Sequence, residues 1–590
     1  MDIHYPVYTI HNECQDCYKC VRECPVKAIR ISGGHASVLS DRCIACGQCI
    51  SICPQGAKQM RKDSSRVSDL LASGSRIIAS LAPSWRGSFS CSSSQIISSL
   101  KELGFYGVSE TALGAQDVSL ATLELIRSEP RRLWISSACP AIVDYLRKYM
   151  PRLVPSLLPL ASPAATHGRM LKEHYGEDTG VVFIGPCSAK KGESDLFPDL
   201  IDTALGFNEL SEMFRSAGIN PDTRESSAVE FEPIAAFEGA LYPLEGGMAE
   251  TMKMAGASDE VSMISVSTIP MFREMLNGMA GDSLSKSVFI EALACQGGCM
   301  AGPCTIGKKA GLQSLMDVRE NALTRKVIPK RAGTVVPQNY FPTSAFKSEP
   351  DAWQIRQAMR RIGKKSVEDE LNCGGCGYNT CRELAVALCE GNAEAQMCIS
   401  YMRRIATRKA GAVFNCMPSG IVMVDNNLNI LETNKSFVRM FAPDLLDGFD
   451  SDPSCLKGAL LDRVLPCCSL FESALETGRE LHKDHYPMGR GLYDISIFSI
   501  EAHQLVGAVI ADVTESEMRR DQIAKKAHSV IAKNMTIVQD IACRLGEHMV
   551  ETEMLLTSIA EGYDPERETE FDGEGDDSRG FLNGLDKLYE

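Results

Sequence analysis

The 590-residue sequence is poor in aromatic residues, at 6% with three tryptophans, and poor in basic charge. Its 61 Lys and Arg face 76 Asp and Glu, a formal net charge of −15. Nucleic-acid binding needs clustered cations, so we expect no such partner. No apolar run is long enough to cross a bilayer, and the first residues carry no secretory pattern. We therefore expect a cytoplasmic protein with no membrane contact.

Cysteine, in contrast, is abundant, with 24 residues in the chain. The cysteines come in tight runs with the spacing of metal ligands, which favours reduced, metal-bound thiolates over a disulfide framework. Sixteen fall into such patterns. Most of the other eight are expected to be small buried hydrophobic residues, namely Cys91, Cys304, Cys389, Cys416, Cys455, Cys467, Cys468 and Cys543.

A chain of this length exceeds a single hydrophobic core, so several domains are expected. Residues 1–62 hold two C-x2-C-x2-C-x3-C-P runs, the bacterial ferredoxin pattern, in which the fourth cysteine of each run ligates the other cluster. Zinc is the alternative, but the spacing is too crowded for an ordinary zinc knuckle. The expected 4Fe–4S ligand sets are Cys14, Cys17, Cys20 and Cys53 for one cluster, and Cys43, Cys46, Cys49 and Cys24 for the other.

Residues 63–75 are polar and Ser-rich, which indicates a linker. Residues 76–345 alternate short apolar runs, typical of buried parallel strands, with amphipathic helical stretches. The strand-like runs are 77–83, 133–137, 180–185 and 287–293. This alternation predicts an α/β domain with its site at the strand ends.

Four cysteines follow these strands directly: Cys139, Cys187, Cys295 and Cys299. Their segments, Ile-Ser-Ser-Ala-Cys-Pro, Ile-Gly-Pro-Cys-Ser-Ala-Lys-Lys and Ala-Cys-Gln-Gly-Gly-Cys, resemble the three signature segments of iron-only (FeFe) hydrogenases, in the family's order and at its spacing. The resemblance covers most of residues 1–345. It implies that the four thiolates hold a cubane and that Cys299 bridges to a di-iron subcluster carrying CO and cyanide.

The resemblance also assigns roles to three other residues. Lys190 would donate a charge-assisted contact to a cyanide, and Ala82 and Pro83 would form the turn that lines the pocket.

The departures from the family concern proton movement and pocket packing. Ala138 stands where the family has its relay cysteine, and Leu158 aligns with the family's relay serine. Where the family has two relay glutamates, this chain offers only Glu124. Gly185 and Leu293 replace pocket methionines, and residues 302–304, Gly-Pro-Cys, replace a glycine run. Each lost proton-transfer step can lower the rate by ~10²–10⁴. The cysteines expected to be metal ligands are therefore present, whereas the proton-relay path of the family is interrupted.

Residues 352–403 resemble the small 4Fe–4S module of corrinoid iron–sulfur proteins and some electron-transport subunits. The pattern C-G-x-C-G-x-x-x-C, a helix and a further cysteine provide one cubane set, with Cys389 as a bystander; the set is Cys373, Cys376, Cys381 and Cys398. The expected cofactors are thus three 4Fe–4S clusters and one H-cluster.

Residues 408–515 resemble a PAS domain, with a hairpin around Asp425–Asn427, a helix starting near Thr433, and two closing strands. His482 and His485 are expected to be solvated rather than haem ligands. Residues 516–562 predict one long helix, with a coiled-coil seam at Val538, Ile541, Leu545, Met549, Thr552, Leu556 and Ile559. The alternative is a helix that packs on its own PAS domain. Residues 563–590 form an acidic tail, predicted to be disordered.

Together these features resemble the sensory branch of the hydrogenase family. The resemblance implies that the protein binds or slowly oxidises H2 and signals redox state to a kinase or phosphatase. Its other implied partners are a ferredoxin-type carrier, the hydrogenase maturation proteins and a second copy of the chain. Two alternatives stay open: an ordinary ferredoxin hydrogenase with another proton path, and a cubane-only electron-transfer or scaffold protein.

Overall fold

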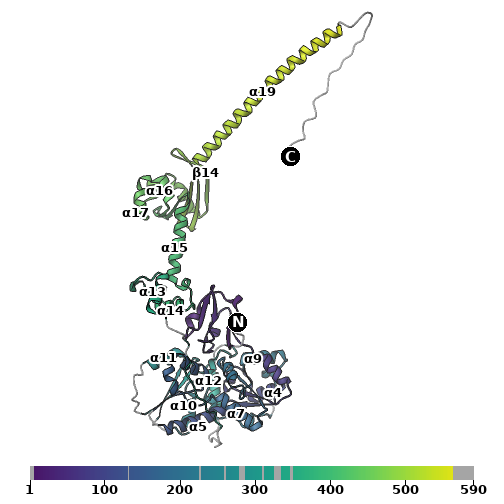
Figure 1. Cartoon of the computed structure of the whole chain (residues 1–590), viewed down its shortest axis with the longest axis vertical. Coiled ribbons are helices and arrows are strands. Elements are labelled where there is room, and N and C mark those ends of the chain that lie inside the picture. The colour runs from purple at the N-terminus through teal and green to yellow at the C-terminus, as the bar shows by residue number, and fades with distance from the viewer. Residues whose placement is uncertain are drawn as a thin grey trace. The chain divides into compact units, whose positions relative to one another are not determined.

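The computed structural model describes residues 5–129, 132–224, 228–257, 261–277, 286–307, 311–323, 334–343, 345 and 350–561. The chain divides into two compact units, residues 1–405 and 406–590 (Figure 1). The first unit holds two parallel sheets and the second an antiparallel one. The multidomain α/β class expected from the sequence is confirmed. The predicted acidic tail lies outside the described residues.

The N-terminal part of the first unit is built from two small antiparallel pairs. Strand β1 (Val7–Thr9) pairs with β4 (Lys58–Met60), and β2 (Ile29–Ser32) pairs with β3 (His35–Val38). The short helices α1 (Lys19–Glu23) and α2 (Gln48–Ile52) each lie inside one cysteine run.

The predicted linker at residues 63–75 is wrong, because its central part is helix α3 (Ser64–Ala72). Val67 is fully buried in the core of the following domain, and Leu70 and Leu71 pack against the same core. These three residues stand at i, i+3 and i+4, so they form one apolar stripe despite the serine-rich composition. The segment therefore fastens two domains together.

The large domain contains two parallel sheets. One has the strand order β6 (Gly107–Glu110), β5 (Ile77–Leu81), β8 (Gly180–Gly185) and β9 (Thr203–Gly206). The other has the order β10 (Val261–Ser267), β11 (Ser287–Leu293) and β7 (Leu133–Ile135). Strands β5, β6, β7, β8 and β9 are buried along their whole length, as expected for sheets covered on both faces.

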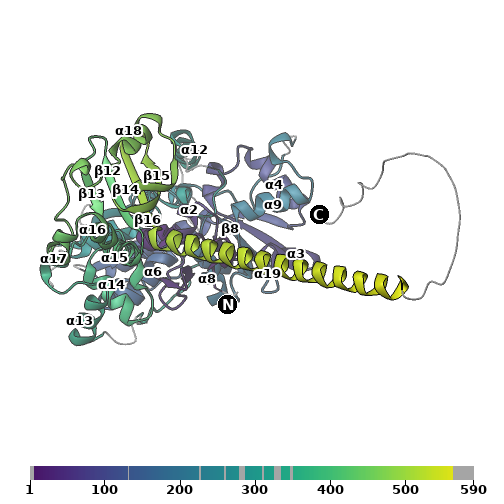
Figure 2. The same cartoon turned by 90° about the horizontal axis from the view of Figure 1, so that it is seen from above.

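Helices accompany both sheets. Figure 2 shows α4 and α9 side by side at one edge of the domain. The helices are α4 (Ser93–Glu102), α5 (Ala112–Ser128), α6 (Pro140–Tyr149), α7 (Pro163–Tyr175), α8 (Ala189–Leu196), α9 (Phe207–Ser216), α10 (Gly247–Met254), α11 (Ile269–Asn277) and α12 (Leu312–Leu323). Helix α6 starts directly after Cys139 and α8 two residues after Cys187, so the cysteines occupy strand-to-helix turns.

The third part of the first unit contains α13 (Ala352–Arg361), α14 (Cys381–Cys389) and the start of α15 (Ile399–Cys416). Its apolar residues share one core with the N-terminal ferredoxin-like part: Leu384 and Met397 lie in the same cluster as Val21 and Ile29.

The second unit folds around a five-stranded antiparallel sheet. Its strand order is β13 (Ile430–Thr433), β12 (Gly420–Asp425), β16 (Leu505–Asp512), β15 (Gly491–Glu501) and β14 (Leu481–Met488). The helices are α16 (Lys435–Phe441), α17 (Leu446–Ser451) and α18 (Cys468–Thr477). The predicted hairpin and closing strands are therefore present.

A buried asparagine fixes the start of helix α16. The side-chain oxygen of Asn434 accepts bonds from the Phe437 and Ile421 N–H groups, and its amide donates to Phe414 and Ser419. An asparagine at this N-cap position ties the helix to the first strand. His482 and His485 lie on β14 with 62% and 49% of their side chains exposed, and contact Asp484 and Glu517 respectively; these are solvated positions.

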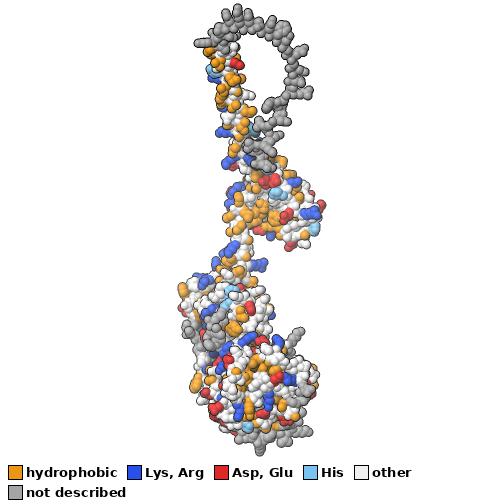
Figure 3. Space-filling model, turned by 90° about the vertical axis from the view of Figure 1, so that its right-hand side faces the viewer, with side chains coloured by type: hydrophobic (Ala, Val, Ile, Leu, Met, Phe, Trp, Pro, Cys, Tyr) orange, Lys and Arg blue, Asp and Glu red, His pale blue; other side chains and the backbone are white. Residues whose placement is uncertain are grey.

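Helix α19 (Thr514–Glu561) is continuous, as predicted. Its apolar side chains are exposed, for example Val538 at 64% and Leu545 at 63%. Figure 3 shows them as an orange band along the helix. Among the described residues, every helix is too short or too polar for a transmembrane span.

Candidate metal centre

The four separated cysteines converge on one cavity. Cys139 follows β7, Cys187 follows β8, and Cys295 and Cys299 follow β11. All four cysteines line one small cavity, whose other walls are mostly apolar, with Ala141, Pro186, Leu293, Ala294 and Gly302. The carboxyl ends of parallel strands thus bring together thiols that are 160 residues apart in sequence, from 139 to 299.

Burial controls the chemistry of these thiols. It raises the pKa of Cys187 to about 11, and raises the pKa of Cys139, Cys295 and Cys299 as well. The neighbouring cysteines add to the shift for three of them, Cys187, Cys295 and Cys299. Four thiolates crowded in a dry cavity need a strongly cationic centre to balance them. The donor set therefore fits a metal cluster.

Lys190 lies beside this cavity with its ammonium group held in place. Its Nζ donates to Ser162 Oγ at 2.7 Å and pairs with the Glu193 carboxylate. It also stands 5.9 Å from the centre of the Phe183 ring. The residue is 8% exposed, and its charge acts to lower the pKa of Cys139, Cys187 and Cys299, which places the ammonium close to these cysteines.

Phe183 fills the space next to Gly185. A Cβ on residue 185 would stand 2.6 Å from the Phe183 ring and 3.1 Å from Ala82 Cβ. The ring thus takes up volume that a larger residue at position 185 would need. Ala82 donates its N–H to Ile184 O at 2.8 Å and accepts from the Trp85 N–H at 3.0 Å. The Ala82–Pro83 turn is therefore fixed against β8.

Two of the expected proton-relay positions, Ala138 and Leu158, carry no side-chain proton donor. Ala138 donates its N–H to Ser136 Oγ at 3.2 Å, and the Ser136 hydroxyl lies 3.2 Å from Met248 Sδ. Leu158 is completely buried, and Glu124 is exposed on α5. The surroundings of Ala138 are thus apolar or engaged in structural hydrogen bonds.

The ferredoxin-like part gathers its eight cysteines into two groups. The thiols that act on Cys20 are Cys14, Cys17 and Cys53, and those that act on Cys49 are Cys24, Cys43 and Cys46. The fourth cysteine of each run therefore lies with the other group, as the spacing predicts. Left-handed backbone at Asp16, Tyr18 and Ala45 curls the loops around each group.

Cys46 also lines the cavity of the four central cysteines. The loop around it presses on the large domain: Ser188 Oγ donates to Ala45 O at 2.6 Å, and a Cβ on Gly47 would stand 2.4 Å from Pro303 Cγ. One ferredoxin group is thereby placed directly beside the central site.

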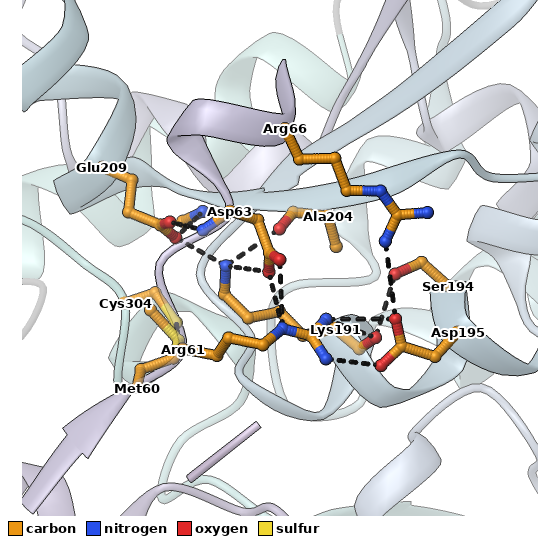
Figure 4. A network of polar contacts seen from close by, with 11 residues as sticks. Met60, Arg61, Asp63, Arg66, Lys191, Ser194, Asp195, Ala204, Glu209 and Cys304 are labelled. Carbon is orange, nitrogen blue, oxygen red and sulfur yellow. Dashed lines mark hydrogen bonds and ion pairs between the residues drawn. The ribbon is translucent and has the colours of Figure 1, made fainter. Parts of the chain in front are cut away.

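A buried ion network fastens the same two domains (Figure 4). Lys191 Nζ contacts Asp63 Oδ2 at 2.8 Å and Glu209 Oε2 at 2.7 Å. Arg61 joins Asp63 at 3.0 Å and Asp195 at 2.7 Å. These residues come from the end of the ferredoxin-like part and from the segment that follows Cys187.

The last four predicted ligands, Cys373, Cys376, Cys381 and Cys398, line a separate pocket together with Ile399 and Tyr378. Cys389, the predicted bystander, does not line it and is exposed. The structure thus groups all sixteen cysteines as the sequence suggested, and their role as ligands stays a prediction.

The sequence patterns did not predict three features of the site. Cys46 lines the central cavity, and Glu193 and Ser162 are the partners of Lys190. The Phe183 ring occupies the space beside Gly185. Glu193 stands three residues after Lys190 in a helix, a spacing that signals an ion pair. The other contacts are made between distant segments and leave no local pattern.

Family comparisons agree with this geometry. Residues 75–303 match the iron only hydrogenase large subunit, C-terminal domain, and residues 6–54 match a 4Fe-4S dicluster domain. Residues 369–400 match an Fe–S cluster family, and residues 410–480 a PAS domain. The chain is an iron-only hydrogenase-like iron–sulfur protein with a PAS domain.

Curated relatives match parts of this hydrogenase-like chain. The NADP-reducing hydrogenase subunit HndD of Solidesulfovibrio fructosivorans is 24% identical over 328 residues, covering 44% of the chain and 55% of the relative. The cytosolic Fe-S cluster assembly factor nar1 of Aspergillus clavatus is 35% identical over 104 residues, 16% of the chain and 17% of the relative. The chain thus spans between about a sixth and about half of these relatives.

Among solved structures, a variant of [FeFe]-hydrogenase HydA1 from Chlamydomonas reinhardtii is 19% identical, with a TM-score of 0.35 over 45% of the chain and 89% of that protein. The PAS domain of nitrogen regulation protein NR(II) from Vibrio parahaemolyticus is 12% identical, with a TM-score of 0.14 over 18% of the chain and 96% of that domain.

Proposed function

We propose that this protein detects hydrogen: it binds or slowly oxidises H2 at a six-iron cluster and passes the resulting redox state through its PAS domain to a partner. The observation that carries the proposal is the contrast at the central site. Four cysteines that line one cavity stand beside buried Lys190, while the expected relay positions include Ala138 and Leu158.

The proposed ligands of the H-cluster are Cys139, Cys187, Cys295 and Cys299, with Cys299 as the bridge to the di-iron unit. That unit, when bound, supplies the hydrogen chemistry. Two of the three N–H donors of Lys190 point to Ser162 and Glu193. Ser162 and Glu193 therefore hold the Lys190 ammonium beside the cavity. An ammonium in this position could orient a negatively charged cyanide ligand.

Infrared spectroscopy tests the binding part of the proposal. The full chain, matured with the di-iron unit, should show CO and cyanide bands that shift between argon and hydrogen. Hydrogen oxidation should be slow, because Ala138 and Leu158, at the expected relay positions, have side chains that cannot transfer a proton. Turnover close to that of a catalytic family member would contradict the proposal of hydrogen detection and support the alternative of an ordinary ferredoxin hydrogenase.

Restoring the relay provides a sharper test. Ala138→Cys should raise hydrogen oxidation, since one effective proton-transfer group contributes ~10²–10⁴ in rate; Leu158 still interrupts the path, so we expect the lower end. Ala165→Cys, which adds a thiol at another buried position, is the control and should leave the rate unchanged. Equal rates for Ala138→Cys and the unchanged protein would mean that proton transfer is not limiting.

A cubane-only protein is the second candidate, and the similarity to the assembly factor nar1 favours it. In that case CO and cyanide bands would be absent after complete maturation. Lys190 weighs against this candidate, because the role that the family resemblance gives it, a contact with a cyanide ligand, would have no use in a cubane-only protein.

The output partner is proposed to be a signalling kinase or phosphatase, and electrons are proposed to leave through a ferredoxin-type carrier. The hydrogenase maturation proteins would supply the di-iron unit. We also propose that the PAS domain and α19 form a homodimer, since the apolar seam of α19 is exposed in the single chain.

A further inference from the structure

The small module around Cys373 is docked on the ferredoxin-like part by a dense set of contacts. Arg42 pairs with Glu390 at 2.9 Å, with both side chains about 15% exposed. The Ile31 N–H donates to Asn392 O at 2.9 Å, and the Gly33 N–H to Glu394 Oε1 at 2.6 Å. Together with the shared apolar core, these contacts make one body of the two parts.

Lys27 stands at the centre of this contact. Its ammonium donates to Val21 O at 3.1 Å and Arg22 O at 2.9 Å in its own domain, and to Gly377 O at 2.7 Å in the small module. All three N–H donors of the lysine are therefore used. Its backbone is left-handed, with φ of 50°, a conformation that is unfavourable for a residue with a side chain.

Gly377 permits the close approach. A Cβ on this residue would lie 2.9 Å from Val21 Cγ1 and 3.2 Å from the Arg22 N, and its φ is +95°. The glycine loop of the small module thus rests on helix α1 (Lys19–Glu23), which contains Cys20 and ends just before Cys24.

Both neighbouring cysteine groups lie close to this bridge. Burial lowers the pKa of Lys27, and Cys24 and Cys376 both oppose that shift. Buried Tyr378 has its pKa raised mainly by burial, and both cysteines add to the rise. Cys24 belongs to the group that contains Cys46, which lines the central cavity. This one ferredoxin group therefore has the central site on one side and the small module on the other.

We propose that the ferredoxin cluster held by Cys24, Cys43, Cys46 and Cys49 is a branch point, and that Lys27 and Gly377 position the cluster of the small module as a side arm of the relay. The source of the electrons rests on the proposed function; the arrangement of the clusters does not. The other ferredoxin group, with Cys17 exposed, forms the arm toward an external carrier.

The electron count suits a junction. Oxidation of one H2 releases two electrons and two protons, and the protons pass to solvent. Each cubane takes up one electron. One electron can therefore reside in the small module while the other leaves through the solvent-facing cluster to a one-electron carrier of the ferredoxin type. Cys398 directly precedes α15, so the side arm ends at the helix that leads along the chain toward the PAS domain.

Electron paramagnetic resonance of the full chain tests the arrangement. After reduction with dithionite, neighbouring one-electron-reduced cubanes should broaden one another's signals. Lys27→Met should remove or weaken the broadening between the small-module cluster and the ferredoxin cluster. It should also lower both midpoint potentials, because a buried cation favours the more negative reduced state. Lys19→Met, at an exposed lysine on the same helix, should change neither.

Gly377→Ala separates position from charge. It should weaken the broadening through the clash with Val21 while leaving Lys27 in place. Gly391→Ala is the matched control, since its φ of +69° is similarly strained and nothing lies within 4 Å of its Cβ. Unchanged broadening in both Lys27→Met and Gly377→Ala, with the iron content intact, would overturn the branch point. Two other results would also overturn it: a spectrum of the unchanged protein without broadening, or broadening that remains when Cys376 is replaced.

Dithionite replaces hydrogen in this experiment, so its outcome is independent of the hydrogen chemistry. Infrared bands from the same samples report on the H-cluster separately. A lost coupling with normal bands concerns the branch alone, and absent bands with normal coupling concern the proposed function alone.

Discussion

Lys191 carries a full charge into the interior, with 1% of its side chain exposed and Asp63 and Glu209 as partners. Lys191→Met should destabilise the full chain by about 3–5 kcal/mol, because buried Glu209 loses the cation it pairs with and Asp63 keeps only Arg61. Thermal and denaturant unfolding, followed together with loss of the ferredoxin-like part by limited proteolysis, would measure this.

The control for this prediction is Lys62→Met. Lys62 pairs with Glu212 at 2.9 Å, but its side chain is 61% exposed. Exposed pairs contribute about 0–1 kcal/mol, so this variant should unfold near the unchanged protein. Equal losses for the two lysines would show that the buried network does not hold the domains together.

Adjacent lysines also show how far residue-scale prediction reaches. The family resemblance assigned Lys190, while nothing local distinguished Lys191. Its partner Asp63 is 128 residues away, so only the fold reveals the pair. The glycine at position 185 was recognised as a departure from the family, yet the Phe183 ring that occupies the space beside it was not foreseen.

Helix α19 is the element whose structure the sequence predicted well and whose role stays a proposal. Its seam residues repeat every three or four positions, and each aliphatic side chain buried in a partner contributes about 1.5–3 kcal/mol. Leu545→Asp should therefore convert a dimer into a monomer in light scattering of the full chain, since it places a charge in the seam. Leu545 is 63% exposed in the single chain.

Cys543→Asp is the matched control, because it adds the same carboxylate about half a helical turn away from Leu545. It should leave the dimer intact. A monomer in the unchanged protein at all concentrations would contradict the seam and favour partner docking by a single helix.

Helix α3 shows why element prediction failed where it did. Serines dominate the segment and suggest a linker, but Val67 is completely buried against the large domain. Composition averages over faces, whereas a helix needs only one apolar stripe. The PAS strands were predictable because alternation and an Asx-type turn are local signals, and both occur within residues 420–433.

At the scale of the whole molecule, the convergence of four cysteines was predictable because each follows a parallel strand. The place of the ferredoxin-like part was not, since no sequence pattern encodes a contact between folded surfaces. Only the folded structure shows that Cys46 lines the central cavity and that Gly377 packs against helix α1. The proposed relay between domains would depend on a few close approaches, and each can be tested singly.

Gly47 is the closest of these approaches beside the central site. Gly47→Ala should push the Cys46 loop away from Pro303 and Ser188, which would lie 2.4 Å and 2.8 Å from the new Cβ. Electron transfer weakens steeply with distance, so reduction of the ferredoxin clusters by hydrogen should slow while the infrared bands stay unchanged. The rate at which hydrogen bleaches the visible iron–sulfur absorption, recorded by stopped flow, measures the effect.

Gly56→Ala is the control for backbone strain. The φ of Gly56, +65°, is just as unfavourable for alanine, but the new Cβ would meet only the flexible Gln59 amide at 3.9 Å. Slowing in Gly47→Ala alone would locate the electron route at this contact, whereas equal bleaching rates in the two variants would place the route elsewhere.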